Sequence, residues 1–535
     1  MKSRVIAAVL AIISLLISPA FGADSIYDEN WQPQPVDTAK SSIYGFRFQE
    51  TQFEYGQLSY AQSSKSLTDV TECDTSNLAL CPSGNRNIYI VLPPCQIMVS
   101  EICIESLEFE DKTTGEFLPA KFLRNVGTKT LAASEVTGTP FGGSVSVWKS
   151  PIPNSDETIE YGVGVGLMYV PDLSQQSKNN NEKLSVLFMQ ATVTPVRKIL
   201  GNYAPAVKRT VNGKLIGGYL DSTEPINRGV LDCVWQEIGI CAKKTSFPDG
   251  SRLKLVLRIP SEVNGWIHGR FQNADIKIEK ISDQVNRLTV SADSAVIPSA
   301  GYLGEYKELT PDMTLALESS GVRVRATGSS GESANVSASD SRAFSYLKAF
   351  APLLGDRANA LKTRWTFQSD IERMNSSCSN KVKGIKGIVS TNAMIYEGTA
   401  PSFDGKTLNY KVGGLHFNPD KTPFLGTYDL VMRSEVARCY YGFSSAPISA
   451  DVSVTSSDGT KQVATTVVGE KDGWLKLGAY GFQFSNPTIK VTLKQNLKST
   501  GSSASINKQI TCIKGKSVKT VRAVNPKCPV GYKTK

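Results

Sequence analysis

The sequence predicts a mainly β protein, built from several antiparallel β-sandwich domains of immunoglobulin-like or jelly-roll-like kind. Short apolar runs alternate with turn-forming residues, and no helix-length periodic segments lie between the strands expected up to about residue 206. A chain of 535 residues has room for about three domains with cores of their own. An apolar content of 40% and a charged content of 20% are typical of soluble globular proteins rather than disordered or membrane ones.

The first residues predict export. Lys2 and Arg4 give a basic start, Val5–Ile17 is apolar, and small residues precede a cleavage site near Gly22. Residues 1–22 are therefore expected to be a signal peptide. An N-terminal membrane anchor is the alternative, but about 13 apolar residues are short for a bilayer. We expect an extracellular or cell-surface protein with no transmembrane segment after signal removal.

The cysteine spacing predicts disulfides, which suit an oxidising compartment. Three successive couples are eight residues apart, and pairing in sequence order is expected throughout. Metal ligation is the alternative, but it normally needs closer cysteine couples together with histidines, and no such combination is present. The ten residues are Cys73, Cys81, Cys95, Cys103, Cys233, Cys241, Cys378, Cys439, Cys512 and Cys528.

Composition shifts divide the body into three expected β-domains, at residues 45–206, 207–392 and 393–497. The second carries a helical insert, because apolar residues between 342 and 365 are spaced for one helical face. Asp340 or Ser341 could cap its start, and Pro352 should kink or split it. We expect this helix to pack over a sheet, with a membrane-surface helix as the alternative.

The third domain has the clearest β pattern, since Asp404-Gly405 and Asp458-Gly459 are tight-turn signals between apolar-alternating runs. Part of it resembles an earlier stretch of the chain. Each stretch contains an apolar strand ending in arginine, then Gly-Trp, then a Phe-x-Asn-x-x-Ile-Lys segment, which suggests two related β-modules. The matched segments are 255–258, 265–266 and 271–278 in the first stretch, and 430–433, 473–474 and 484–491 in the second.

Positive charge is concentrated at the C-terminus. Of the formal net charge of +10, the expected signal peptide carries two charges and residues 508–535 carry eight, so the body between them is neutral. This tail follows a Ser- and Gly-rich linker at 498–507. A cationic segment favours anionic polymers, and export makes nucleic acid an improbable partner. The basic residues are Lys508, Lys514, Lys516, Lys519, Arg522, Lys527, Lys533 and Lys535.

The tail reads Ile-Thr-Cys512-Ile-Lys-Gly-Lys, then Val-Asn-Pro-Lys-Cys528-Pro-Val-Gly-Tyr-Lys. This pattern resembles a short C-terminal module that ends various exported proteins of high-GC Gram-positive bacteria. The resemblance covers about a twentieth of the chain and implies an exported bacterial surface protein, but no reaction. A disulfide between the two cysteines would fold the tail into a small basic hairpin. A disordered basic end is the alternative.

No catalytic, cofactor-binding or metal-binding residues are predicted. The two histidines, His268 and His416, fall in different expected domains, and nothing in the sequence brings either to a nucleophile. The glycines at 162–166 lack phosphate-loop spacing and suit close packing in a sheet. Trp266 and Trp474 could stack on sugar rings, but their repeated position favours a core role.

The sequence thus favours an exported, non-catalytic surface or extracellular-matrix protein, whose β-domains serve recognition or structure. Its basic tail would associate with an anionic cell-wall polymer or glycan. Two alternatives stay open: a secreted hydrolase acting on polysaccharide through a carboxylate pair, and a carbohydrate-binding protein. Specific ligand and oligomeric state are not predicted.

Overall fold

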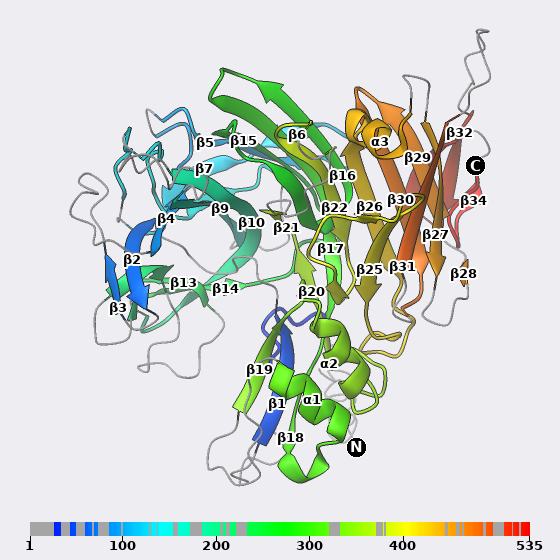
Figure 1. The fold of residues 1–535 in the computed structure, drawn as a ribbon, viewed down its shortest axis with the longest axis horizontal. Helices are drawn as coiled ribbons and strands as arrows, with labels where there is room; N and C mark the ends of the chain where they lie inside the picture. The colour runs from blue at the N-terminus through cyan, green and yellow to red at the C-terminus, as the bar shows by residue number, and fades with distance from the viewer. Residues whose placement is uncertain are drawn as a thin grey trace, which may run out of the picture.

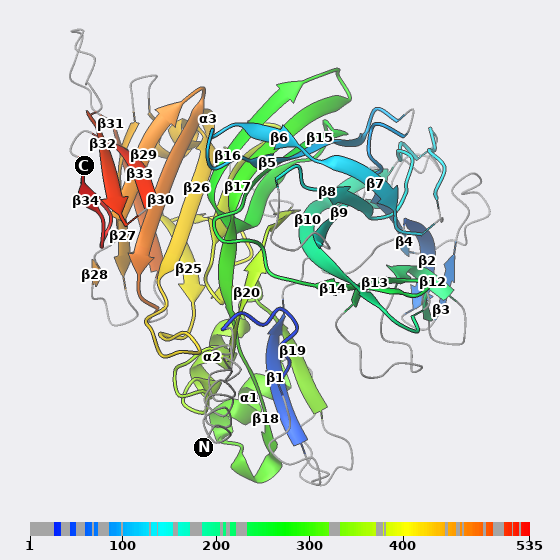
Figure 2. The ribbon, with the colours of Figure 1, turned by 180° about the vertical axis from the view of Figure 1, so that it is seen from behind.

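Figures 1 and 2 show the fold of the chain in a computed structural model. The structure describes residues 26–33, 43–49, 59–66, 69–72, 85–97, 100–127, 130–135, 137–152, 159–171, 184–203, 207–209, 215–220, 233–319, 332–370, 378, 381–443, 448–455, 461–462, 465–484, 488–495, 508–515, 517–523 and 526–535. The expected signal peptide, the 498–507 linker and the Cys73 and Cys81 couple lie outside the described residues.

The predicted fold class is confirmed, because the described chain is mainly β and its strands form several antiparallel sheets. Three short α-helices occur in the described residues: α1 Pro311–Ser319, α2 Ala343–Phe350 and α3 Ser434–Tyr441. None of the helices in these residues is long and apolar enough to cross a membrane.

A long sheet runs through the molecule, and its neighbouring strands are antiparallel except for β16 and β22. Strands β7 (Lys121–Asn125) and β8 (Ser146–Lys149) extend it from β9, and β13 (Cys233–Glu237) and β14 (Ile240–Lys244) extend it from β10. Its order is β3 (Asp69–Glu72), β2 (Tyr60–Ser66), β4 (Asn85–Val91), β9 (Ile159–Pro171), β10 (Leu184–Leu200), β21 (Thr366–Asp370), β16 (Gly265–Lys280), β22 (Ile385–Thr391), β26 (Gly426–Arg433), β30 (Trp474–Phe482) and β29 (Thr465–Lys471).

A second sheet shares strand β16 with the first. The N-terminal half of β16 pairs with β21 and β22, whereas its C-terminal half pairs with β17. The register shifts between Gln272 and Asp275, where Asn273 has a φ of 51°. This β-bulge bends the strand from one sheet into the other. The second sheet has the order β6 (Phe117–Pro119), β5 (Cys103–Glu110), β15 (Arg252–Pro260), β17 (Val285–Ser299) and β16, with β20 (Ala360–Arg364) on the far half of β17.

A third sheet faces β26 and β30 and closes a sandwich with them. One apolar cluster joins Leu430 and Leu477 of the long sheet to Tyr410 and Val491 of the third sheet, and all four are buried. Alternating inward residues of two facing sheets are what a β-sandwich buries. The order of this sheet is β23 (Ile395–Tyr396), β25 (Leu408–Gly413), β31 (Thr488–Gln495), β27 (Ile448–Thr455) and β28 (Lys461–Gln462), with β24 (Ser402–Phe403) on β25.

Helices α1 and α2 cover a small separate sheet, which forms the lower lobe of Figure 1. Phe46 of this sheet packs against Tyr346 and Phe350 of α2 at ring distances of 5.8 and 4.3 Å. The strands are β18 (Gly301–Glu305), β1 (Ile43–Gln49) and β19 (Glu332–Ser337), and β1 and β19 are parallel. Elsewhere β11 (Val207–Arg209) pairs with β12 (Leu215–Leu220).

The helix expected over 342–365 forms only in its first half. The cap expected from Asp340 or Ser341 is not found: the N-cap residue is Arg342, which makes no side-chain capping bond, and the Asp340 carboxylate accepts a bond of 2.8 Å from the backbone N–H of Arg342 ahead of the first turn. Helix α2 ends at Phe350, and Pro352 lies in the turns that follow. A proline lacks the N–H that a helix needs. Beyond it, Leu353 and Leu354 lie in these turns, and Leu361 lies in strand β20.

The two similar stretches of sequence do not form equivalent modules, so this prediction was wrong. Strand β26 of the later stretch pairs with β30, which places Arg433 opposite Trp474. Strand β15 of the earlier stretch pairs instead with β5 and β17, and the Trp266 strand pairs with β21 and β22. Both stretches have the same apolar pattern, but a pattern alone does not choose strand partners.

Paired strands also cross the boundaries expected at 206 and 392. Strand β5 of the first segment bonds to β15 of the second, and β22 of the second bonds to β26 of the third. The core therefore continues across both positions, and the division into independently folding domains stays a prediction.

The bulge in β16 is held by a buried carboxylate from β26. Asp429 is 1% exposed and accepts bonds from the backbone N–H of Asn273, at 3.0 Å, and from the hydroxyl of Tyr480. Burial raises the pKa of Asp429 to about 6, although these hydrogen bonds and Lys476 oppose the shift. On the solvent side of the bulge, Arg252 of β15 donates to the Asn273 carbonyl at 3.0 Å. Side chains from β26 and β15 thus bind the two backbone groups of Asn273 and hold the bend.

His268 is a second buried titratable group on β16. It is 4% exposed, and neither ring nitrogen has a hydrogen-bond partner among the described residues. Burial lowers its pKa to about 4. The imidazole is therefore neutral in the folded protein at neutral pH, as a packed core residue would be.

These two groups predict opposite pH trends in stability. The folded-state pKa of Asp429 lies above its ordinary value, so its contribution to the free energy of unfolding falls as pH rises from about 4 to about 6, by about 3 kcal/mol. That of His268 lies below its ordinary value, so its contribution falls by about 3 kcal/mol as pH drops from about 6.5 to about 4. Urea unfolding of D429N and H268L across this range measures both.

Relative to the parent protein, D429N should gain stability as pH rises, and H268L should lose it. The double variant is the control, since the two slopes should cancel in it. Differences that stay constant with pH would contradict the assignment.

Candidate functional site

Four disulfides join cysteines of the described residues, with the partners that sequential pairing predicts. The pairs are Cys95–Cys103, Cys233–Cys241, Cys378–Cys439 and Cys512–Cys528. Such cross-links fit an oxidising, extracellular environment. Every cysteine in the described part of the chain is bonded, so these positions offer no free thiol.

The C-terminal segment forms a small sheet of its own. Strand β32 (Lys508–Lys514) lies between β33 (Ser517–Ala523) and β34 (Lys533–Thr534), and both pairs are antiparallel. Cys512 is fully buried and forms a disulfide with Cys528. In Figure 2 this sheet lies at the edge of the molecule, next to β27 and β28. We call residues 508–535 the basic module.

The basic module presents its lysines to solvent. Lys519 lies 5.2 Å from the ring centre of Tyr532, whose hydroxyl is 3.1 Å from that of Ser517. This hydrogen bond, followed by the charges of Lys519 and Lys514, lowers the pKa of Tyr532. Lys508 and Arg522 are in strands, but their side chains are outside the described set, as is all of Lys516. The exposed lysines are Lys514, Lys519, Lys527, Lys533 and Lys535.

The two histidines are not brought together. His268 is buried in β16, whereas His416 is partly exposed and contacts Asp356 through Nδ1 at 2.5 Å. Sequence reasoning missed this Asp–His pair, because 60 residues separate the two. Asp356 also accepts a bond from the His416 backbone, and Phe417 bonds to Asp356 and Ala358. The pair therefore joins the segment at 356–358 to the segment at 416–417.

The two predicted tryptophans have different environments. Trp266 is 1% exposed and packs in the core. A side chain at Gly387 would lie 2.5 Å from its ring, so only glycine fits opposite it. Trp474 is half-buried and borders a groove of about 640 Å³ beside Arg433, whose guanidinium is 5.8 Å from the ring centre. Trp266 is therefore a fully buried core residue, whereas Trp474 packs against the core with one side open to the groove.

The glycines at 162–166 pack in the sheet, as expected. A Cβ at Gly162 would lie 2.6 Å from the Trp235 ring, and a Cβ at Gly166 would overlap Tyr89. In the part of the chain that the structure describes, no three His, Cys, Asp or Glu side chains are grouped to hold a metal ion.

No protein-family model, curated protein or solved structure matches this chain.

The tryptophan environments predict unequal effects of truncation. W266A should lower the free energy of unfolding by about 3–5 kcal/mol, because it empties a fully packed site. W474A should cost about 1 kcal/mol, because solvent already reaches its ring. Denaturant unfolding of the two variants tests this, and equal losses would contradict the difference in burial.

Proposed function

We propose that this protein is an exported surface or matrix protein that attaches to an anionic polymer through its basic module. The support is the display of five exposed lysines on a disulfide-closed sheet, in a segment with no acidic residue. The neutral body gives no long-range attraction of its own, so the module directs the molecule to negative charge. The cross-link keeps the lysines at fixed separations, which reduces the entropy lost on binding.

The test changes the five exposed lysines of the module to glutamine. Each exposed charge contact contributes about 0.5 kcal/mol, so the variant should bind soluble polyphosphate about fiftyfold to a hundredfold more weakly. Binding of the parent should also weaken steeply with added salt. Titration calorimetry measures both effects.

The matched control changes five exposed lysines of the body and should bind polyphosphate as the parent does. Equal affinity of the module variant and this control would overturn the proposal. The control positions are Lys121, Lys280, Lys307, Lys348 and Lys471.

Carbohydrate binding is a second candidate, favoured by the groove beside Trp474. In the described residues, the Ser434 hydroxyl and the Arg433 Nε are buried without hydrogen-bond partners, and both residues line this groove. An aromatic face beside polar groups suits a sugar ring. W474A should then lose binding on an array of neutral oligosaccharides, while the module variant keeps it. Unchanged binding by W474A would reject this candidate.

The secreted hydrolase stays an alternative. It needs two carboxyl groups held on opposite sides of a scissile bond. Glu435 and Asp472 line the Trp474 groove, so the same purified protein can be assayed for polysaccharide cleavage with both changed to amides.

A further inference from the structure

Two lysines and two hydroxyl groups gather on one face of the basic module. Lys514 of β32 lies directly opposite Ser517 of β33, and Lys519 follows on the same face because side chains alternate along a strand. The Tyr532 hydroxyl lies 3.1 Å from the Ser517 hydroxyl, and the Lys519 ammonium lies 5.2 Å from the centre of the Tyr532 ring. We call these four residues the lysine–hydroxyl cluster.

A disulfide holds the two parts of this cluster together. Cys512 lies on the same face of β32 as Lys514, because two positions separate them. Its bond to Cys528 keeps the segment that carries Tyr532 on that face. A Cβ at Gly531 would lie 3.2 Å from the Lys514 Nζ, so the same segment borders this ammonium group. The cluster is therefore formed before a ligand binds, which reduces the entropy lost on binding.

The cluster has protons to donate around one oxygen. The Ser517 hydrogen bond lowers the pKa of Tyr532, and the charges of Lys519 and Lys514 lower it further, so both charges act on the same hydroxyl. Either hydroxyl can donate in the bond between Ser517 and Tyr532, which leaves one hydroxyl proton for another acceptor. Each ammonium group carries three N–H donors. Such a set of donors suits an anion with several oxygens.

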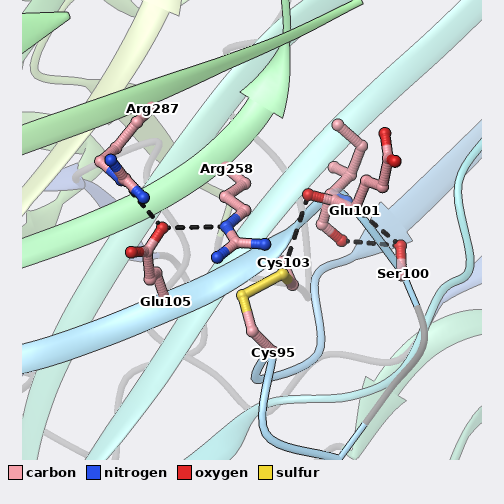
Figure 3. The surroundings of a disulfide bond; sticks show 8 residues. Cys95, Ser100, Glu101, Cys103, Glu105, Arg258 and Arg287 are labelled. Atoms are coloured by element: carbon pink, nitrogen blue, oxygen red, sulfur yellow. Dashed lines mark hydrogen bonds and ion pairs between the residues drawn. A yellow bond between two sulfur atoms is a disulfide. The ribbon is translucent and has the colours of Figure 1, made fainter. Parts of the chain in front are cut away.

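Two cations of the body share a carboxylate, whereas the segment that forms the module contains none. Figure 3 shows Arg258 and Arg287, which both donate to Glu105, at 2.9 and 3.0 Å, near the Cys95–Cys103 disulfide. Residues 508–535 include no acidic residue, so this segment supplies no such counter-charge for its lysines. An anionic ligand can supply it instead.

The larger groove of the body is a poor site for an anion. It measures about 1000 Å³ and is lined by Glu101, Glu135 and Glu262, and by no lysine or arginine in the described residues. An anionic ligand finds donors and positive charge on the module, but no lining cation in this groove.

We propose that the lysine–hydroxyl cluster is a phosphate site, through which the module selects a phosphate-bearing polymer over a carboxylate one. This inference rests on the proposed attachment of the module to an anionic polymer, and it names the class of polymer. A phosphate group carries its oxygens in a tetrahedron, so ammonium and hydroxyl donors can approach it from several sides. A carboxylate has two oxygens in one plane and leaves part of this donor set unused.

Two lysines on the opposite face of the module provide a matched comparison. Lys533 pairs with Ile513, the residue before Lys514, so it lies on the other face of the sheet, and Lys535 follows two residues later. Both are exposed, as Lys514 and Lys519 are. General attraction to negative charge would use the two pairs of lysines alike, whereas a phosphate site depends mainly on Lys514 and Lys519.

The experiment compares K514Q/K519Q with K533Q/K535Q in the full chain, because both variants lose the same charge. Titration calorimetry with soluble polyphosphate should show about a tenfold loss of affinity for the first variant and about a threefold loss for the second. Polygalacturonate, a carboxylate polymer, should bind the parent more weakly than polyphosphate does, and the two variants should lose equal affinity for it.

Y532F tests the hydroxyl separately from charge. It keeps the ring beside Lys519 and removes one donor, so affinity for polyphosphate should fall about threefold, while affinity for polygalacturonate should stay as in the parent. All three variants should keep the melting temperature of the parent, because the changed side chains are exposed or half-buried.

The outcomes separate this inference from the proposed function. Equal losses of polyphosphate affinity in K514Q/K519Q and K533Q/K535Q would overturn the phosphate site, while attachment through the module would stand. Equal affinity of the parent for polyphosphate and polygalacturonate would also overturn it. If the variant with all five lysines changed binds polyphosphate as tightly as the parent, both the site and the proposed function fail.

Discussion

The architecture depends on one strand belonging to two sheets. Strand β16 bonds to β21 and β22 in one half and to β17 in the other, so it must bend where the register shifts at Asn273. The bend leaves backbone groups that need partners in the interior, and Asp429 supplies one of them. Three residues earlier, buried Arg270 donates to the carbonyls of Thr391 and Ala393 at 2.9 and 2.6 Å. Polar contacts thus hold β16 where it passes from one sheet to the other, while apolar side chains pack on both sides of this point.

Local pattern was enough to predict the β class, the cysteine partners in the described residues and the break of the 342–365 helix at Pro352. Each of these depends on neighbours in the chain: a couple of cysteines eight residues apart, or a proline that lacks the N–H a helix needs. Strand partners were not predictable in this way. The stretches around Trp266 and Trp474 have the same pattern but different neighbours, because strand partners are chosen by contacts between residues far apart in the chain, such as Trp266 and Asp370 or Arg433 and Trp474.

The candidate sites differ in the same way: one is made from neighbouring residues of the chain, and the other from distant segments. The basic module could be predicted, since eight cations without an acid are visible in the sequence itself. The groove lined by Glu101, Glu135 and Glu262 could not be predicted, because these residues come from three separate loops. The sequence also gives no sign that the Tyr169 hydroxyl is buried without a hydrogen-bond partner in the described residues, because Tyr169 lies in an ordinary strand pattern.

The Cys378–Cys439 bond has a mechanical consequence. It encloses the chain from β22 to the middle of α3. If the C-terminal end is held and the molecule is pulled, tension that reaches Cys439 passes directly to Cys378 through the sulfur atoms. The strands in between, including β26, carry none of that load. Strands C-terminal to Cys439, such as β31, lie outside the enclosed loop and bear the tension directly, whereas β22, which pairs with β16, lies inside the loop and is shielded from it.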